Sequence, residues 1–296
     1  MQNLQDDKMK IAYLITVYHN YNHLKKLIGA LNDDNVVFFI HVDKKSNMPN
    51  NLHEFDNIIF IERAKIWWGG WSNLDAMIRL IRSAIRHNFD YYILLSGTDY
   101  PIRPNSFLYK KLSTGREFIS INNGFGIPKV EDRTKYYYFD CFDRRNLRSI
   151  KTLFFYVLER TMRLFFQKKS HPFAQIYYGP TWWALSHQCL MYVLDQIDNN
   201  KDYIRFYQTS WCPEESFFQT IIGNSPFFSK CTTNLTYVDW DAEPPKPAWI
   251  NQNHIELFKK QLEFDSTFGT YMPFFARKFD DSRENLIELI EKELRN

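Results

Sequence analysis

Apolar runs and helical patterns alternate along the N-terminal part of the chain. Four runs of apolar residues predict buried strands at 11–17, 36–43, 57–62 and 91–99. Between them, apolar residues at helical spacing predict one helix around Leu24 to Leu31 and another over 74–87. Such alternation is typical of a largely parallel sheet covered by helices on both faces. The predicted fold is therefore α/β, with a Rossmann-like N-terminal half.

Polar residues stand where the predicted strands end. Asp43 ends the second predicted strand and Asp99 ends the fourth. Ligands of parallel α/β sheets bind beyond the carboxyl ends of the strands, so these carboxylates are the first candidates for a site. Beyond residue 115 the alternation loosens, and 122–145 has the character of a long ordered loop. A helical tail is expected from about Arg283.

The stretch 147–169 has the pattern of a helix that lies in a membrane surface. Its apolar residues recur at helical spacing and are flanked by cations. The apolar positions are Ile150, Leu153, Phe154, Val157, Leu158, Met162, Leu164 and Phe165. An ordinary helix packed on the sheet, with solvated cations at its edges, explains the same pattern equally well. Both interpretations stay open at this point.

Composition narrows the class of protein. The chain has 296 residues, of which 45% are apolar, enough to bury a sizeable core. Its net charge of +3, with no basic tail, gives no support to nucleic-acid binding. The 26 Phe, 18 Tyr and 8 Trp offer flat faces for sugar rings, although core packing accounts for most of them.

The sequence predicts a cytoplasmic protein. No apolar run approaches the roughly 20 residues of a spanning helix, and residues 1–10 are too polar for a signal peptide. The four cysteines lack CxxC spacing, so reduced thiols are expected. If 147–169 binds lipid, the protein would lie peripherally on the inner face of the cell membrane.

Two short motifs suggest chemistry only weakly by themselves. WGGWS, 68–72, reads as a tight turn close to a ligand, with Trp68 beside it and Ser72 as a helix N-cap. Asp239-Trp240-Asp241 spells the DxD that holds a cation in many sugar-nucleotide transferases, but a solvated turn is favoured. The chain has no GxxxxGK[ST], GxGxxG or HExxH motif.

Two charged motifs each allow a structural and a functional interpretation. Arg277 and Lys278, set between aromatic residues, suit a diphosphate, whereas the local sequence favours a surface turn. Pro213-Glu214-Glu215 fits the first turn of a helix, where the macrodipole stabilises acidic residues. A catalytic role requires one of the two carboxylates to face a cleft and accept a proton from a hydroxyl.

Seven stretches of the chain belong together: HVDKKS (41–46), WGGWS (68–72), LLSGTDYPIR (94–103), YGPTWWALS (178–186), PEESFFQTIIGNSPF (213–227), NLTYVDW (234–240) and FFARKFD (274–280). In this order they resemble the core-2/I-branching glycosyltransferase family, which includes the peptide O-xylosyltransferases. They cover most of the chain from about Lys10 to Asp280, and the last three are most similar to the xylosyltransferase branch.

The resemblance implies a GT-A-like single domain that transfers a sugar from a UDP-sugar with inversion, without a metal ion or other cofactor. It implies that Glu215 is the general base, that Glu214 caps or positions the helix, and that Arg277 and Lys278 neutralise the leaving UDP. The donor-binding residues that it implies are Asp43, Trp68, Asp99, Arg277 and Lys278. The expected domain covers 9–282, with a nucleotide-sugar half at 9–115, an acceptor half at 116–282 and a tail at 283–296.

The acceptor side is expected at Thr181, Trp182, Trp183 and Arg133, and its partner is a glycan or lipid-linked glycan. Many relatives have GSxW or GSDW where this chain has Gly179-Pro180-Thr181-Trp182. Animal members are Golgi membrane proteins, whereas no anchor is expected here. A bacterial enzyme of capsule, exopolysaccharide or lipopolysaccharide synthesis reconciles these features.

Two other functions remain open. One is a metal-dependent transferase that uses Asp239 and Asp241, and the other is a glycan- or membrane-binding protein without catalysis on the same scaffold. A glycosidase is disfavoured, because it needs two opposed carboxylates and adjacent glutamates on one helical turn point apart.

Overall fold

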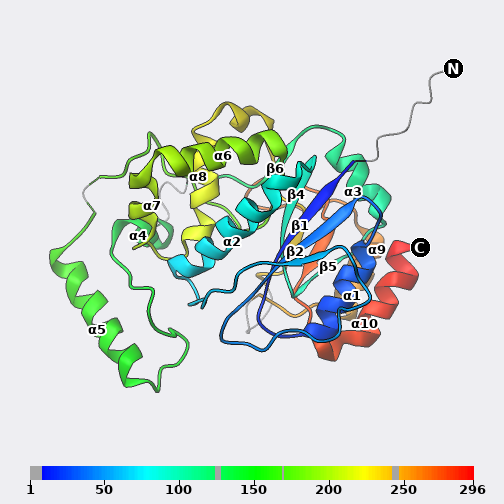
Figure 1. Cartoon of the computed structure of the whole chain (residues 1–296), viewed down its shortest axis with the longest axis horizontal. Coiled ribbons are helices and arrows are strands. Elements are labelled where there is room, and N and C mark those ends of the chain that lie inside the picture. The colour runs from blue at the N-terminus through cyan, green and yellow to red at the C-terminus, as the bar shows by residue number, and fades with distance from the viewer. Residues whose placement is uncertain (1–8, 124–127, 169, 242–246) are drawn as a thin grey trace.

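A mostly parallel seven-stranded sheet runs through the centre of the molecule, with helices on both faces (Figure 1). The structure is a computed structural model that describes residues 9–123, 128–168, 170–241 and 247–296. The strands lie in the order β3-β2-β1-β4-β7-β6-β8, and among them β7 runs antiparallel to both neighbours. Their bounds are β1 Ile11–Val17, β2 Val36–Val42, β3 Ile58–Phe60, β4 Tyr91–Ser96, β6 Glu117–Ile119, β7 Trp183–Ser186 and β8 Cys231–Thr232.

Two core clusters fill the two faces of this sheet, because side chains alternate along each strand. In β1, Tyr13 and Ile15 belong to one cluster, whereas Ala12 and Leu14 belong to the other. The first cluster takes in α1 Tyr21–Leu31, α3 Asn105–Leu112, α9 Gln252–Lys260 and α10 Glu284–Ile290. The second takes in α2 Trp71–Ala84, α6 His187–Asn199 and α8 Phe217–Gly223. The α/β prediction with a GT-A-like arrangement is confirmed.

A second, three-stranded sheet brings the C-terminal part of the chain to the end of β4. It consists of β5 Asp99–Pro101, β10 Phe275–Arg277 and β9 Thr236–Val238. β10 is central, antiparallel to β5 and parallel to β9, so that Arg277 lies opposite Asp99. The pairing carries the arginine of the FARK segment to the edge at which the first sheet is expected to bind ligands.

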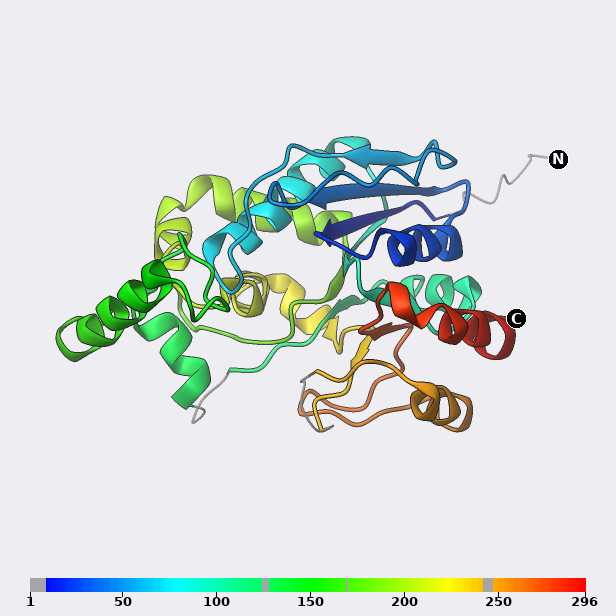
Figure 2. The same cartoon turned by 90° about the horizontal axis from the view of Figure 1, so that it is seen from below.

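Residues 128–168 form an arm that stands away from the sheet (Figure 2). It holds α4 Pro128–Lys135, a loop and α5 Ile150–Phe165, and α7 Lys201–Tyr207 lies close to it in Figure 1. The buried residues of α5 are Thr152 and Glu159, so the prediction that this helix packs on the sheet is wrong. The sequence placed its end at Lys169, which lies outside the described residues.

Two further predictions from the sequence, a helix cap and a loop, are wrong. Ser72 is not the N-cap of α2, because the helix begins at Trp71; its hydroxyl accepts a hydrogen bond from Trp67 N (2.7 Å) and donates one to Asp140 Oδ1 (3.1 Å). The segment expected as a loop contains α4, while its residues 124–127 lie outside the described part of the chain.

The C-terminal tail is helical, as predicted. α10 is followed by a π-helical turn, Glu291–Arg295, and Glu284 pairs with Lys26 of α1. The cysteines carry no disulfide. In the ranges that the structure describes, no helix is both long and apolar enough to cross a membrane.

Candidate active site

The two adjacent glutamates occupy different environments at a 3₁₀ turn, Pro213–Glu215, which precedes α8. Glu214 is 7% exposed, and its Oε1 accepts a hydrogen bond of 2.9 Å from Asn73 Nδ2 on α2. Burial, with the charge of Glu215 as a smaller cause, raises the pKa of Glu214 to about 7. Glu214 therefore joins the turn to α2 and does not point in the same direction as its neighbour.

Glu215 keeps a third of its side chain exposed and forms an ion pair with Arg133 of α4. Its backbone is fixed on both sides: Glu215 N donates to Cys212 O (3.0 Å), and Gly179 N donates to Glu215 O (2.9 Å). The second bond ties the YGPTWW stretch to the PEE turn. A partly exposed carboxylate on a fixed backbone has the access that a general base requires.

Arg277 is held in a fixed position by Asp99 and Trp182. Its Nε lies 3.2 Å from Asp99 Oδ1, and its guanidinium lies 4.2 Å from the ring centroid of Trp182. Burial lowers the pKa of Arg277, and the charges of Asp99 and Glu215 oppose that shift. Arg277 and Glu215 are therefore within electrostatic reach of each other, although 62 positions separate them in the sequence (277 − 215).

Lys278 points to a neighbouring aromatic surface. Its Nζ lies 4.5 Å from the ring centroid of Trp249, and its backbone O accepts a hydrogen bond of 3.1 Å from Ile250 N. Burial lowers the pKa of Lys278, and the adjacent Arg277 lowers it further. The interpretation of this pair as a surface turn is wrong for Arg277, whose partner is the buried Asp99.

The glycines of the WGGWS stretch are explained by close packing within the protein. Gly69 has φ +71°, and a Cβ there would overlap the ring of Trp211; a Cβ on Gly70 would overlap the Asp140 carboxylate. Cys212 N also donates to Gly69 O at 2.8 Å. This loop therefore docks on the segment that leads into the PEE turn. The side chain of Trp68 stays 52% exposed.

Asp43, at the carboxyl end of β2, organises the neighbouring loops. Its Oδ1 accepts hydrogen bonds from Lys45 N (3.0 Å) and Ile66 N (3.3 Å). Lys45 Nζ lies 3.5 Å from the second oxygen and 4.4 Å from the ring centroid of Trp67. Asp43 thus brings a cation and an indole to the edge of the sheet where a nucleotide is expected.

The residues predicted on the acceptor side separate into two groups. Thr181 is half-buried, and Arg133 faces Glu215. Trp182 and Trp183 are 7% and 2% exposed. Trp182 supports Arg277, and Trp183 packs on Phe218 with ring centroids 5.3 Å apart, so neither indole is presented to an acceptor.

The DxD stretch lies after β9, where Asp239 Oδ2 is 3.0 Å from His254 Nε2. Asp239 Oδ1 accepts a hydrogen bond of 2.9 Å from Asp241 N. Residues 242–246, which follow, lie outside the described residues. Within the described ranges no group of three or more His, Cys, Asp or Glu residues is arranged to hold a metal ion.

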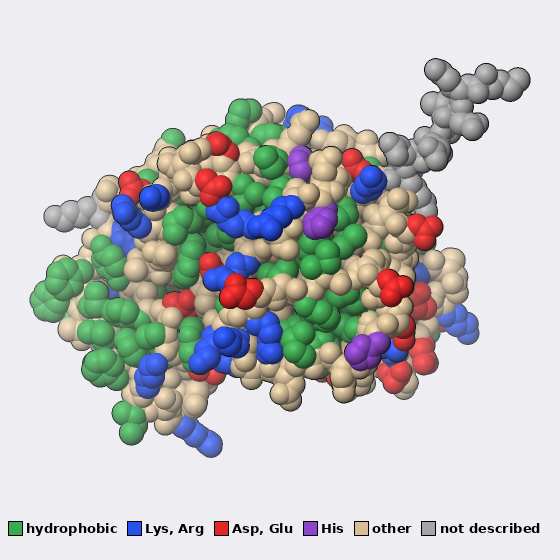
Figure 3. Space-filling view, viewed as in Figure 1, with side chains coloured by type: hydrophobic (Ala, Val, Ile, Leu, Met, Phe, Trp, Pro, Cys, Tyr) green, Lys and Arg blue, Asp and Glu red, His purple; other side chains and the backbone are tan. Residues whose placement is uncertain are grey.

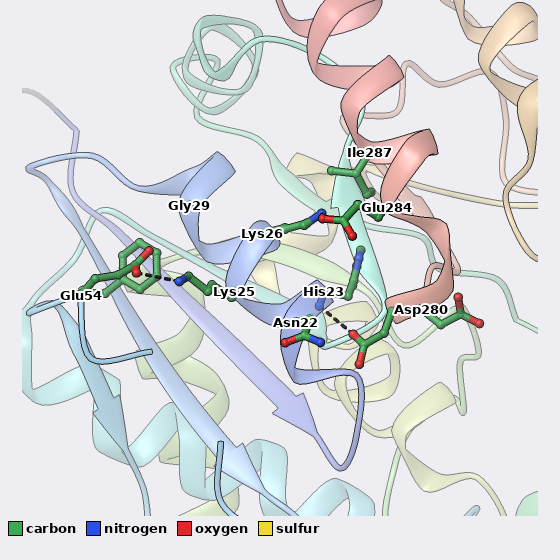
Figure 4. Close-up of a pocket in the computed structure, with 11 residues that line it drawn as sticks. Asn22, His23, Lys25, Lys26, Gly29, Glu54, Asp280, Glu284 and Ile287 are labelled. Atoms are coloured by element: carbon green, nitrogen blue, oxygen red, sulfur yellow. Dashed lines mark hydrogen bonds and ion pairs between the residues drawn. The ribbon is translucent and has the colours of Figure 1, made fainter. Parts of the chain in front are cut away.

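A separate cavity of about 590 Å³ lies between α1 and α10 (Figure 4). Its lysines are already paired, Lys25 with Glu54 (2.7 Å) and Lys26 with Glu284. Asp280 and Asp281 add two further carboxylates to its lining. None of the residues predicted to bind donor or acceptor lines this cavity, and its charge does not suit a diphosphate.

Several residues around the site escaped the sequence reasoning. Tyr18 directly follows β1, at the edge of the sheet where a ligand is expected; its position at the carboxyl end of a predicted strand was the available signal. Asn73 and Asp140 bind Glu214 and Ser72 across long sequence separations, for which no local pattern exists.

Comparison with known proteins agrees with the geometry. The model of the Core-2/I-branching enzyme family matches residues 11–262. Xylosyltransferase 2 of Rattus norvegicus is 27% identical over 308 residues, covering 96% of this chain and 33% of the relative. The Homo sapiens xylosyltransferase 2 is 27% identical (98% and 34% covered), and the Rattus norvegicus xylosyltransferase 1 is 25% identical (95% and 35% covered). The chain thus spans about a third of the length of these relatives.

Proposed function

Because the chain belongs to the core-2/I-branching enzyme family, we propose that it is a glycosyltransferase that moves a sugar from a UDP-sugar to a hydroxyl of a glycan acceptor. One observation carries the proposal. The partly exposed Glu215 carboxylate and the fixed Arg277 guanidinium act on each other electrostatically at the carboxyl edge of the sheet. A base and a cation so arranged suit a nucleophilic hydroxyl on one side and a leaving diphosphate on the other.

In the proposed reaction, Glu215 accepts the proton of the acceptor hydroxyl while the hydroxyl oxygen bonds to C1 of the sugar. The bond between C1 and the diphosphate oxygen breaks, and its electron pair leaves with UDP. Arg277 and Lys278 neutralise that charge, which is the task of a metal ion in other transferases. A single direct displacement inverts the configuration at C1.

Arg133 has two roles in this proposal. Its ion pair with Glu215 orients the carboxylate. If Glu215 is the base, the acceptor hydroxyl must approach the carboxylate that Arg133 occupies, so that acceptor binding would rearrange the pair. A polysaccharide acceptor, as in capsule, exopolysaccharide or lipopolysaccharide synthesis, stays a prediction.

Thermal unfolding with a panel of UDP-sugars tests donor binding without knowledge of the acceptor. A donor that binds the native state raises the midpoint, and a concentration of about 100 times its Kd adds about 2.7 kcal/mol. Lys278→Ala should weaken UDP binding on the order of 10-fold or more, because it removes a charge-assisted contact. The exposed Lys260→Ala is the matched control. Equal UDP affinity in both variants would refute the role of Lys278.

Product release separates the remaining alternatives. Once a donor is known, UDP released only when an acceptor is added marks a transferase, whereas a binding protein releases none. Undiminished turnover in excess EDTA would exclude a mechanism that needs a cation held by Asp239 and Asp241. Loss of turnover in EDTA, restored by a divalent cation, would refute the metal-independent mechanism.

A further inference from the structure

The outer face of α5 is a stripe of exposed apolar side chains. At helical spacing, Ile150 is 85% exposed, Phe154 62%, Val157 65% and Phe165 74%. Leu153 and Leu164 belong to the same stripe, at 51% and 77%. Figure 3 shows hydrophobic side chains gathered at the end of the molecule where Figure 1 places α5. Soluble proteins rarely leave such a contiguous patch uncovered without a use for it.

The opposite face of α5 already has its partners within the arm. Phe155 stacks on Phe142 with ring centroids 5.0 Å apart, and Glu159 forms a buried ion pair with Arg144. The helix therefore cannot cover its outer stripe by rolling inward, because that would expose a charge pair that is 4–5% exposed. Whatever covers the stripe must come from outside the described arm.

Cations border the stripe. Arg148, Lys151 and Arg160 are exposed beside it, while the acidic residue of α5, Glu159, is buried and neutralised by Arg144. A second copy of the chain on this stripe would bring these like charges together, which is unfavourable. An anionic surface complements them instead. The combination of an apolar face with flanking Lys and Arg is that of helices which lie in a lipid headgroup layer.

We propose that α5 docks in the surface of a membrane that contains anionic lipids, with its axis parallel to that surface. Its 16 residues span about 24 Å, too short to cross a bilayer but suited to lying in the headgroup region. Docking places Ile150, Phe154 and Phe165 among the acyl chains and the bordering cations at the phosphates.

Two side-chain contacts connect the arm to the candidate active site. The Arg144 guanidinium, which pairs with Glu159 of α5, also lies 4.5 Å from the ring centroid of Trp211. Trp211 stands two positions before Pro213, the first residue of the PEE turn. A docked α5 is therefore connected to the turn through Arg144 and Trp211. The docking itself does not depend on the proposed reaction.

Sedimentation with lipid vesicles tests the proposal on the full chain. The wild type should bind vesicles of phosphatidylcholine with phosphatidylglycerol more tightly than vesicles of phosphatidylcholine alone. The triple variant Arg148→Gln/Lys151→Gln/Arg160→Gln should lose on the order of 100-fold in affinity for the anionic vesicles at low salt, because each cation contributes separately. Arg86→Gln/Lys201→Gln/Lys260→Gln, exposed elsewhere, removes the same charge and should lose far less.

An apolar variant tests the stripe itself. Ile150→Ser/Phe154→Ser/Phe165→Ser should lose more than about tenfold in affinity for the anionic vesicles. Met191→Ser/Phe228→Ser/Leu262→Ser, with apolar side chains 45–57% exposed elsewhere, should bind like the wild type. Amide hydrogen exchange of the wild type, with and without vesicles, covers the case of a misfolded variant, and we expect added protection in α5.

Three results would overturn the proposal. The first is no binding to either kind of vesicle. The second is equal loss in the stripe variants and their controls. The third is a dimer of the wild type, detected by sedimentation without lipid, that does not form in the apolar triple variant. A second copy of the chain would then cover the stripe.

Discussion

The central sheet buries its apolar residues, whereas the arm exposes a stripe of them. In the sheet, β1 sends Leu14 into one core and Ile15 into the other, and both are 0% exposed. In the arm, α5 turns its apolar stripe outward and is held by Arg144, which pairs with Glu159 and lies over Trp211. The sheet is thus stabilised by buried area, and the arm by a few polar and cation–aromatic contacts. The stability of the arm should therefore depend on a few side chains.

The largest effect is expected at the ion pair that holds the arm. Glu159→Gln leaves the Arg144 guanidinium buried without a counter-charge, which costs about 3–5 kcal/mol. Arg144 Nη1 donates to Glu159 Oε2 at 2.8 Å, and Arg144 Nη2 also donates to Phe139 O at 3.1 Å, so the loop should loosen with the helix. Denaturant unfolding and amide exchange over 136–160 measure the change.

Lys151→Gln is the control on the same helix, since Lys151 is exposed. It should change stability by less than about 0.5 kcal/mol. If both variants unfold alike, the arm does not depend on the buried pair, and the contrast with the sheet is wrong.

A smaller effect is expected at the joint between the sheet and the arm. Gly69→Ala must take a left-handed backbone and drive a methyl group into the Trp211 ring. Gly115→Ala meets the same backbone strain, φ +67°, with no atom within 4 Å. The difference between the two variants isolates the contact and should be about 1–3 kcal/mol in unfolding free energy. An equal loss in both would show that the loop does not rest on Trp211.

An effect of the same order concerns the pH dependence that Glu214 confers. Its folded pKa, about 7, lies above the ordinary 4.5 because of burial, so the folded state holds a proton that the unfolded chain releases. The stabilisation is fully present below about pH 4.5 and is lost as the pH rises through 7. Glu214→Gln should remove this slope, worth roughly 1–3 kcal/mol between those limits. The exposed Glu288→Gln should retain it, and the same slope in both variants would contradict a buried, protonated Glu214.

Patterns in the local sequence predicted the strands and helices that local burial determines. The apolar runs located β1 and β2 to within a residue, because both faces of these strands are buried. The helical period found α5 but not what its stripe faces, since periodicity identifies a face without naming its neighbour. α4 was missed despite usable signals, with Pro128 at its first position, Glu131 in the first turn and Arg133 in the last.

The candidate site shows where sequence reasoning stops. Glu214 and Glu215 are equivalent by local rules, and their separation into a buried and an exposed carboxylate depends on Asn73 and Arg133, distant in the sequence. The resemblance to a family assigned Glu215 and Arg277 to the same site, which no spacing rule does. It also assigned Trp182 and Trp183 to the acceptor, whereas packing with Arg277 and Phe218 buries both.

The most direct test of the account is the transfer rate of Glu215→Gln, measured together with its UDP affinity. The amide keeps the size of the side chain but cannot accept the acceptor proton, so the rate should fall by about 10²- to 10⁴-fold while UDP binds as in the wild type. The exposed Glu263→Gln should transfer at the wild-type rate. Transfer by Glu215→Gln within a few-fold of wild type would contradict the assignment of Glu215 as the base.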